Sequence, residues 1–378
     1  MERIKIKPRH NYIKKLEKIS FNFHSTNGLY WDESAYYKFN LFEINEIEEA
    51  TNKLYEMCLT AVQHVIDNDL FDKLNINRNL IPLILRSWEN DEPSIYGRFD
   101  LAYDGLRPPK MLEFNGDTPG TLYESSIVQH KWLEDVSIRD KQFNSIQEKL
   151  MGYWYRLLDY LKGETLHFTS VDSDEDVTIT KYLMDTATKA GIATKYIGIQ
   201  DIGWDDKNNE FVGLNNETIF NIFKLYPWEW LIQENFGMNI VKDSAESKWI
   251  EPAWKVILSS KGILAILWEL FPHNQYLLPA YFDDPHDMYN YVKKPFFSRE
   301  GANITIFRNG IQTTTVDGEY DEEEYVYQEL FELPNWDGNF PVIGSWVIGN
   351  ESCGIGIREN NLEITDNSSR FIPHLIKI

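Results

Sequence analysis

Acidic, amide and arginine side chains alternate along two neighbouring stretches of the sequence near residue 100. The first stretch is GRFDLAYDG at 97–105, and the second is MLEFNGDTPG at 111–120. Because alternate residues of a strand project to the same face, Arg98 shares a face with Asp100, and Glu113 shares one with Asn115. Glycine and two prolines between the stretches mark a bend, so the returning strand can bring Glu113 and Asn115 opposite Asp100.

This pattern is suited to a hard cation with an anion beside it. The oxygens of Asp100, Glu113 and Asn115 are ligands that Mg²⁺ prefers, with its other positions left to water and phosphate. Arg98 adds a forked donor that matches a carboxylate or another oxyanion. An exposed hairpin with cross-strand ion pairs would carry the same residue types, so the spacing alone leaves both interpretations open.

Two lysines are candidates for binding phosphate. Lys261 is expected in the first turn of a helix over 259–271, where the positive end of the helix dipole and a lysine together favour an anion. A lysine that bends back to solvent is the alternative. Lys293 and Lys294 must point to opposite sides of a strand over 289–295, so one of them can face inward.

The loop that follows this strand is rich in small residues. It reads FFSREGAN at 296–303, with Ser298, Gly301 and Ala302 as its small members. Such a loop can lie over phosphates and donate backbone N–H groups to them, although loops of glycine and serine are also common on protein surfaces.

Two later strands add further candidates. The strand YVYQEL ends in Gln328, Glu329 and Leu330, whose amide and backbone groups can contact an adenine edge, as the end of any buried strand can. Arg358 lies in GIGIRE, where glycines allow close approach and the arginine can neutralise a transferring phosphoryl group. A salt bridge from Arg358 to Glu359 or Glu363 is the alternative.

The elements that must position these residues alternate between helices and strands. Apolar residues recur every three or four positions over 43–66 and 142–161, which predicts two amphipathic helices. From residue 165 the pattern becomes strand, helix and strand, which is one β-α-β unit. Further strands are expected from 220 to a turn at Pro227, and in hairpins that turn at 309–310 and 349–350.

Composition and charge limit the classes of protein to which the chain can belong. The 378 residues carry a formal net charge of −22, which argues against nucleic acid as a partner and allows a cationic substrate. Two distant cysteines, Cys58 and Cys353, suggest neither a disulfide framework nor a thiolate metal site, so a reducing cytoplasm fits best. No segment approaches the roughly 20 apolar residues of a membrane span, and the start lacks the apolar run of a signal peptide. The acidic run at 317–324 is expected to be a mobile surface loop.

Ten blocks of the sequence resemble, in order, the synthetase domain of the glutathionylspermidine synthase family. They run from about Tyr30 to His374 and are YWDESAYYKF, RFDLAYDG, LEFNGDTPGTLYESSIVQHKWLED, FKLYPWEW, EPAWKVILSSKGILAILWELFP, YVKKP, REGANI, YVYQEL, IGSWVIGNESCGIGIRE and NSSRFIPH. The resemblance implies an α/β (α+β) fold of the ATP-grasp class, circularly permuted as in eukaryotic glutathione synthetase. It also implies a stand-alone member without the amidase domain of the bifunctional proteins.

The resemblance also implies a role for each candidate residue at its matching position. The magnesium ligands are Asp100, Glu113 and Asn115, and the arginines that hold the carboxylate or the phosphoryl group are Arg98 and Arg358. The residues at ATP are Lys261, Lys294, Gly301 in the phosphate-covering loop, and Gln328 with the Glu329–Leu330 backbone at the adenine. Of the family's two glutathione-binding serines, the first is replaced here by Thr118 and the second by Gly120.

We therefore expect an ATP- and Mg²⁺-dependent ligase that joins a small-molecule or short-peptide carboxylate to an amine through an acyl phosphate. The expected acceptor includes polyamines, and acidic residues at Asp172, Asp174 and Glu175 can receive one or can lie in solvent. One synthetase unit is expected over 1–378, with a helical and metal-binding region at 1–160, a β-α-β substrate lobe at 161–250, a nucleotide lobe at 251–345 and a C-terminal return at 346–378.

Two other classes of protein remain open from the sequence. One is a nucleotide-binding protein without ligase activity, such as a regulatory or partner subunit, which would bind ATP and release no ADP with any acceptor. The other is a purely structural module, which would show no thermal shift with ATP and Mg²⁺.

Overall fold

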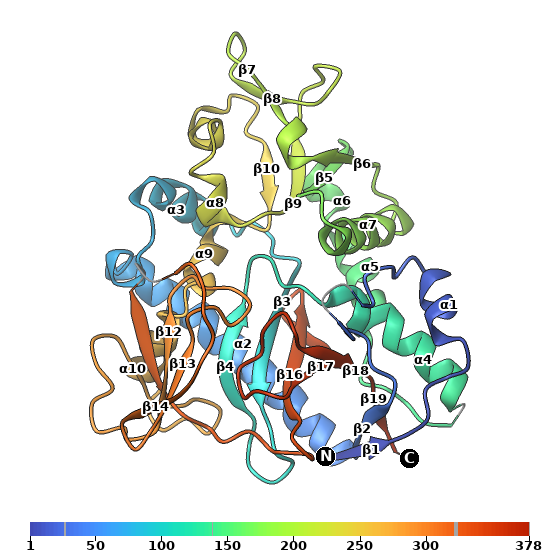
Figure 1. Cartoon of the computed structure of the whole chain (residues 1–378). Helices are drawn as coiled ribbons and strands as arrows, with labels where there is room; N and C mark the ends of the chain where they lie inside the picture. Colours follow the sequence, from blue (N-terminus) through green and yellow to red (C-terminus); the bar gives the residue numbers. More distant parts are fainter. Residues whose placement is uncertain (26–27, 138, 321–323, 378) are drawn as a thin grey trace.

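The computed structural model describes residues 1–25, 28–137, 139–320 and 324–377. Three larger sheets occur in these ranges: a central antiparallel sheet, a second antiparallel sheet beside it, and a parallel sheet above both in the view of Figure 1. Part of the acidic run expected as a surface loop, residues 321–323, lies outside the described residues.

The central sheet is covered on one face by a 27-residue helix, α2 (Leu41–Asp67). Its strand order is β18–β17–β16–β3–β4, with β3 (Tyr96–Ala102), β4 (Lys110–Asn115), β16 (Phe340–Ile348), β17 (Glu351–Asn360) and β18 (Arg370–Ile372). Phe99, Ile343 and Ile357 join apolar residues of α2 in one core. Because strand residues alternate, the intervening positions project from the opposite face, toward the cavity described below. The helix expected over 43–66 and both hairpins in this sheet are confirmed.

The second sheet contains the strands expected on either side of the small-residue loop. Its order is β11–β15–β12–β13–β14, with β11 (Ala280–Tyr281), β12 (Tyr291–Pro295), β13 (Thr305–Arg308), β14 (Ile311–Thr315) and β15 (Tyr325–Glu329). The turn at 309–310 joins β13 to β14 as predicted. The helix expected over 259–271 begins later, as α10 (Ile263–Leu270), and a break separates it from the short helix α9 (Val256–Ser259). The break follows from tertiary hydrogen bonds, because Lys261 N–H donates to the Phe296 carbonyl and Ser260 Oγ donates to the Leu74 carbonyl.

The parallel sheet contains the predicted β-α-β unit. Its order is β10–β9–β5–β6, with β5 (Leu166–Ser170), β6 (Thr194–Gly198), β9 (Asn221–Leu225) and β10 (Lys248–Ile250). Helix α7 (Asp174–Lys189) connects β5 to β6 and begins where Ser173 Oγ accepts a hydrogen bond from Asp176 N–H. After β9, Pro227 leads into the short helix α8 (Trp228–Leu231).

The remaining elements frame these sheets. β1 (Glu2–Lys5) and β19 (His374–Ile376) both pair with β2 (Ala35–Phe39), so the two ends of the chain meet in one small sheet (Figure 1). β7 (Gly203–Asp205) and β8 (Glu210–Val212) form a hairpin. The other helices are α1 (Tyr12–Glu17), α3 (Ile81–Glu89), α4 (Gln129–Val136), α5 (Ile146–Arg156) and α6 (Leu158–Leu161).

Two details differ from the expected boundaries of elements and lobes. The helix expected over 142–161 begins later and is interrupted between α5 and α6 at Leu157. The expected lobe boundary between residues 345 and 346 falls inside β16. Within the described ranges, none of the helices combines the length and the apolar character that a membrane crossing requires.

Candidate active site

A cavity of about 730 Å³ is lined by residues from all three larger sheets. This volume is within the range of small-molecule binding sites. The site residues predicted from the sequence all line it: Arg98, Asp100, Glu113, Asn115, Thr118, Lys261, Lys294, Gly301, Gln328, Glu329, Leu330 and Arg358. The fold therefore brings the predicted residues together, while their chemical roles stay predictions.

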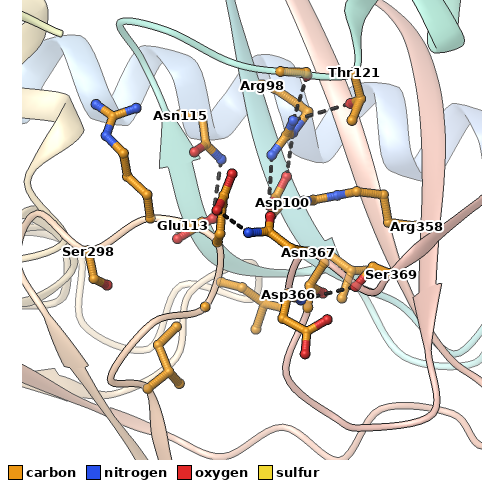
Figure 2. Close-up of a pocket in the computed structure, with 18 of the residues that line it drawn as sticks. Arg98, Asp100, Glu113, Asn115, Thr121, Ser298, Arg358, Asp366, Asn367 and Ser369 are labelled. Carbon is orange, nitrogen blue, oxygen red and sulfur yellow. Dashed lines mark hydrogen bonds and ion pairs between the residues drawn. The ribbon is translucent and has the colours of Figure 1, made fainter. Parts of the chain in front are cut away.

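Asp100 is held between two arginines on the central sheet (Figure 2). Arg98 donates from Nε and Nη2 to the two oxygens of Asp100 at 2.7 and 3.1 Å, and Arg358 donates to Oδ2 at 2.7 Å. Burial disfavours the charge on Arg98, but the Asp100 carboxylate raises the pKa of the guanidinium above its ordinary value. The site therefore carries one positive charge in excess at this point, which suits an anionic substrate group.

A glycine in β16 leaves room for Arg98 to lie across the sheet. Gly344 pairs with Asp100, and a Cβ at this position would stand 2.8 Å from Arg98 Cδ. Arg98 would have to shift for any larger residue to fit there. The sequence shows this glycine inside a strand, which is a signal for close approach by another group.

Glu113 and Asn115 lie on the neighbouring strand in the predicted register. Glu113 pairs with Asp100 and Asn115 with Arg98, so all four side chains share one face. Asn115 Nδ2 donates to Glu113 Oε1 at 3.3 Å. Burial of Glu113 works against its charge, but Lys261 and Lys294 hold its pKa well below the ordinary value. Glu113 is therefore an ionised carboxylate at neutral pH.

Lys294 is the strand lysine that faces inward. Its Nζ donates to the Leu112 carbonyl at 2.8 Å and to Gln328 Oε1 at 2.7 Å, while Gln328 Nε2 donates to the Met111 carbonyl at 2.9 Å. Burial lowers the pKa of Lys294 to about 8, with a smaller contribution in the same direction from Lys261. The Gln328 amide is thus engaged at both ends and fixes the lysine in place.

Lys261 reaches the site from a different position than expected. It lies two residues before the first residue of α10, outside the first turn of that helix. Its Nζ donates to the Ser298 carbonyl at 2.5 Å and is 3.4 Å from Glu113 Oε2. The lysine therefore points into the cavity, and the alternative that it bends back to solvent is wrong.

The covering loop, residues 296–303, is held against the C-terminal segment on one side. Gly301 has φ +73°, and a Cβ there would meet the Thr365 carbonyl oxygen at 2.5 Å, so both the backbone angle and the space require glycine. Asn367, in the same C-terminal segment, donates a hydrogen bond to Glu300 of the covering loop. Several residues between 363 and 369 line the cavity, and sequence reasoning did not identify them.

On its other side the covering loop is held by Arg299. This guanidinium donates to Thr118 Oγ1 at 2.9 Å and to Glu229 Oε1 at 2.7 Å, and it lies 5.0 Å from the ring centroid of Trp230. Thr118 is therefore engaged by the loop in this conformation. Arg299, Glu229 and Trp230 were not predicted as site residues, because their partners come from distant parts of the chain.

Acidic residues at the start of α7 form a separate wall of the cavity. Asp174, Glu175 and Asp176 line it, whereas Asp172 does not contribute. Glu175 is exposed to the cavity, and desolvation within this recess together with the nearby Glu124 raises its pKa to about 8. Of the two interpretations left open for these acids, the cavity position of Asp174 and Glu175 favours contact with a substrate.

The donor set fits a magnesium ion through three side chains. Among the described residues, no group of three or more His, Cys, Asp or Glu side chains is placed to hold a metal. Asp100, Glu113 and Asn115 nevertheless offer two carboxylates and one amide oxygen on adjacent strands, which are hard ligands. A carboxylate has about four lone-pair sites. The two arginines occupy three of those on Asp100, so one remains for a cation.

Comparison with known proteins relates the whole chain to one group of enzymes. The family model described as "Glutathionylspermidine synthase preATP-grasp" matches residues 3–377. A "Putative acid–amine ligase" of Haemophilus influenzae is 40% identical over 97% of this chain and 97% of its own length. Trypanothione synthetase of Crithidia fasciculata is 28% identical over 86% of this chain, and the bifunctional glutathionylspermidine synthetase/amidase of Escherichia coli is 25% identical over 93%. The matches span 54% and 61% of those two longer proteins.

Among solved structures, a glutathione synthetase-like effector of Globodera pallida has the same overall fold. It aligns over 98% of both chains with a TM-score of 0.58 and 11% sequence identity. At this identity the likeness concerns the fold alone. It confirms the predicted mixed α/β, glutathione synthetase-like architecture.

Proposed function

Because the chain belongs to the glutathionylspermidine synthase family and is an ATP-dependent acid–amine ligase, we propose that it joins a peptide or amino-acid carboxylate to a polyamine-like amine through an acyl phosphate. The observation that carries the proposal is the convergence of two arginines, two lysines and two carboxylates with an acidic wall in one cavity. Such a site can neutralise a triphosphate at one end and receive an amine at the other.

The lysines are proposed to hold the phosphates of ATP. Lys261 and Lys294 both line the cavity near Glu113, the covering loop contacts Lys261 through the Ser298 carbonyl, and Gly301 gives that loop its close fit. The end of β15, with Glu329 and Leu330, is proposed to contact the adenine. Gln328 is proposed to act there by fixing Lys294, since its own amide is engaged.

Asp100, Glu113 and Asn115 are proposed to hold Mg²⁺, which when bound would offset the negative charge of the phosphates. Arg98 is proposed to orient the substrate carboxylate, with Thr118 nearby, for in-line attack on the γ-phosphorus. In that step the carboxylate oxygen bonds to phosphorus, and ADP departs.

The second step uses the residues on the other side of the carboxylate. The amine nitrogen bonds to the carbonyl carbon of the acyl phosphate, and inorganic phosphate departs. Arg358 is proposed to stabilise the oxyanion or the departing phosphate. The covering loop is proposed to exclude water, because an acyl phosphate would otherwise hydrolyse. Asp174 and Glu175 are proposed to receive the ammonium group of the acceptor, one of whose amines must lose a proton before it can react.

The arrangement of the chain is proposed to be a circularly permuted ATP-grasp. In support, the strands that carry Asp100 and Glu113 precede the second sheet in sequence, and β16 to β18 complete their sheet only after it. Three of the lobe boundaries are proposed as expected, at 1–160, 161–250 and from 251, while the nucleotide lobe is proposed to end before β16, which belongs to the central sheet.

The test is a screen for ADP release by the full chain with ATP and Mg²⁺. Peptides and amino acids are paired with polyamines and simple amines, and the product is identified by mass. We expect ADP release that requires both partners, with a product equal in mass to acid plus amine minus water. ADP release that never yields a condensation product would contradict the proposal.

A further inference from the structure

Arg299 closes a ring of contacts that joins the covering loop to the two segments facing it. The guanidinium donates to Thr118 at 2.9 Å and to Glu229 at 2.7 Å. Thr118 follows Asp117, whose Oδ2 accepts from the Trp228 backbone N–H at 2.9 Å, and Glu229 follows Trp228. The ring therefore runs from the loop to the 116–121 segment, on to α8, and back to the loop.

The base of this ring is rigid because it rests on a buried ion pair. Lys224 at the end of β9 donates to the other oxygen of Asp117 at 2.6 Å, and both side chains are at most 1% exposed. Its ammonium also donates to the Tyr226 carbonyl and lies 4.7 Å from the centroid of the Trp228 ring. These contacts fix the turn from which Glu229 projects, so Glu229 presents its carboxylate at a defined place.

The contact between the covering loop and this base leaves two polar atoms without hydrogen bonds. Glu229 Oε2 and Arg299 Nε are both buried without a hydrogen-bond partner, although an arginine and a carboxylate can form two parallel bonds. Trp230 gives the guanidinium an aromatic face at 5.0 Å. Glu229 therefore faces Arg299 with one made hydrogen bond and one free acceptor, and Arg299 keeps a free donor.

We propose that Glu229 is a positioning residue that docks Arg299 and so holds the covering loop closed. The inference rests on the proposed function, in which that loop shields an acyl phosphate. In this arrangement the covering loop closes over the nucleotide only when the 116–121 segment is ordered, because Arg299 contacts both Thr118 and Glu229. Loop closure and occupancy of the carboxylate site are thereby coupled.

The experiment is hydrogen–deuterium exchange of the full chain with Mg²⁺ and the non-hydrolysable analogue AMP-PNP. In the wild type we expect the analogue to slow exchange of the peptide covering 296–304. In Glu229→Gln we expect that peptide to exchange about tenfold faster than in the wild type, since a charge-assisted hydrogen bond is lost. Arg299→Lys keeps the charge and loses the fork, so it should give a smaller increase.

The matched control is Glu332→Gln, which removes another arginine–glutamate pair with the same 2.7 Å separation, to Arg308, elsewhere in the nucleotide lobe. In this variant the peptide covering 296–304 should exchange at the wild-type rate. Equal protection in wild type and Glu229→Gln would overturn the docking role and leave the nucleotide site standing. Faster exchange throughout the parallel sheet in Glu229→Gln would instead mark a structural residue, which also overturns it.

A wild type without protection by AMP-PNP would reject the proposed role of the loop at the nucleotide, and the docking role with it. Once an acid and an amine are known, the ratio of ADP to amide gives a second readout. It should be near one in the wild type and severalfold higher in Glu229→Gln, because an open loop admits water. An unchanged ratio would contradict the inference.

Discussion

At the scale of single residues, Arg358 forms a different ion pair from the surface salt bridge that the sequence left open as an alternative. Arg358 does not pair with Glu359 or Glu363 as the alternative held. Glu359 is held by Arg3 and Arg370, and Glu363 by Arg308. Arg358 is therefore left to share Asp100 with Arg98.

The first prediction concerns this trio. Arg98→Lys and Arg358→Ala should each lower kcat at least about a hundredfold, because each removes a donor aimed at developing charge. We choose lysine at position 98 because Arg98 is only 4% exposed and makes two of the three hydrogen bonds to Asp100, so alanine there would remove most of the compensation for a buried charge. Thermal melts of both variants should stay close to that of the wild type. Ligation at near-native rates in either variant would remove that residue from the mechanism.

The second prediction concerns the pH dependence of nucleotide binding. Burial lowers the pKa of Lys294 to about 8, so its positive charge is present below that pH and is lost above it. Binding of AMP-PNP with Mg²⁺, measured by calorimetry, should therefore weaken above pH 8 by up to about tenfold per unit. Lys294→Met should bind weakly at every pH and show a flatter profile.

Glu175 also has a pKa of about 8 and gains negative charge over the same range. The comparison between wild type and Lys294→Met separates the two groups, because only the contribution of the lysine is removed. A pH profile that is the same in both proteins would contradict the assignment of Lys294.

At the scale of elements, the period-two pattern was sufficient to predict the hairpin that carries Asp100 and Glu113. Alternation along a strand sets the face of each side chain, and a β-bulge after Asp100 does not disturb the register of the pairs that matter. The β-α-β unit and the later hairpins were predictable for the same local reasons. The break before α10 was not, because hydrogen bonds to Leu74 and Phe296 create it.

Parts of the site that depend on contacts between distant segments were likewise not predicted. The residue types of Lys261, Lys294 and Arg358 indicated phosphate chemistry even where the local structure differed from expectation. The contact between Arg299 and Glu229 joins residues 70 positions apart, and neither type nor spacing signals it. Gln328 was expected at the adenine from its place on a strand, but its engagement with Lys294 depends on two neighbouring strands.

The third prediction belongs to strand β16. Gly344→Ala places a methyl group 2.8 Å from Arg98 Cδ, closer than two such carbon atoms can approach. We expect turnover to fall at least about tenfold because Arg98 is displaced from Asp100. Gly152→Ala in α5, where nothing lies within 4 Å of the new methyl, is the matched control and should keep full activity and gain up to about 1 kcal/mol in stability. Full activity in Gly344→Ala would show that the close approach is not needed.

At the scale of the whole molecule, the net charge of −22 is reflected in the cavity, where acidic side chains outnumber basic ones by eleven to five. Three of these acidic side chains, Asp174, Glu175 and Asp176, lie together at the start of α7. A field of this sign raises the local concentration of a cationic acceptor.

The fourth prediction tests that field with the amine found in the screen. Its KM should rise severalfold between about 20 and about 300 mM salt, since screening shortens the reach of the charges. Glu175→Gln should raise the KM of the amine and leave that of the acid unchanged. Because the pKa of Glu175 is raised to about 8, the substitution should matter more above pH 8 than below. The exposed Asp337, paired with Lys5, offers Asp337→Asn as a control without effect.

The central sheet has one further consequence. β3 comes from the first third of the chain, whereas β16 and β17, which complete the sheet beside it, come from the last tenth. During synthesis, Asp100 must therefore wait until the ribosome has released nearly the whole polypeptide before Arg358 can reach it. A nascent or prematurely terminated product that lacks Arg358 holds only two of these three charged side chains, so we expect no ligation from it.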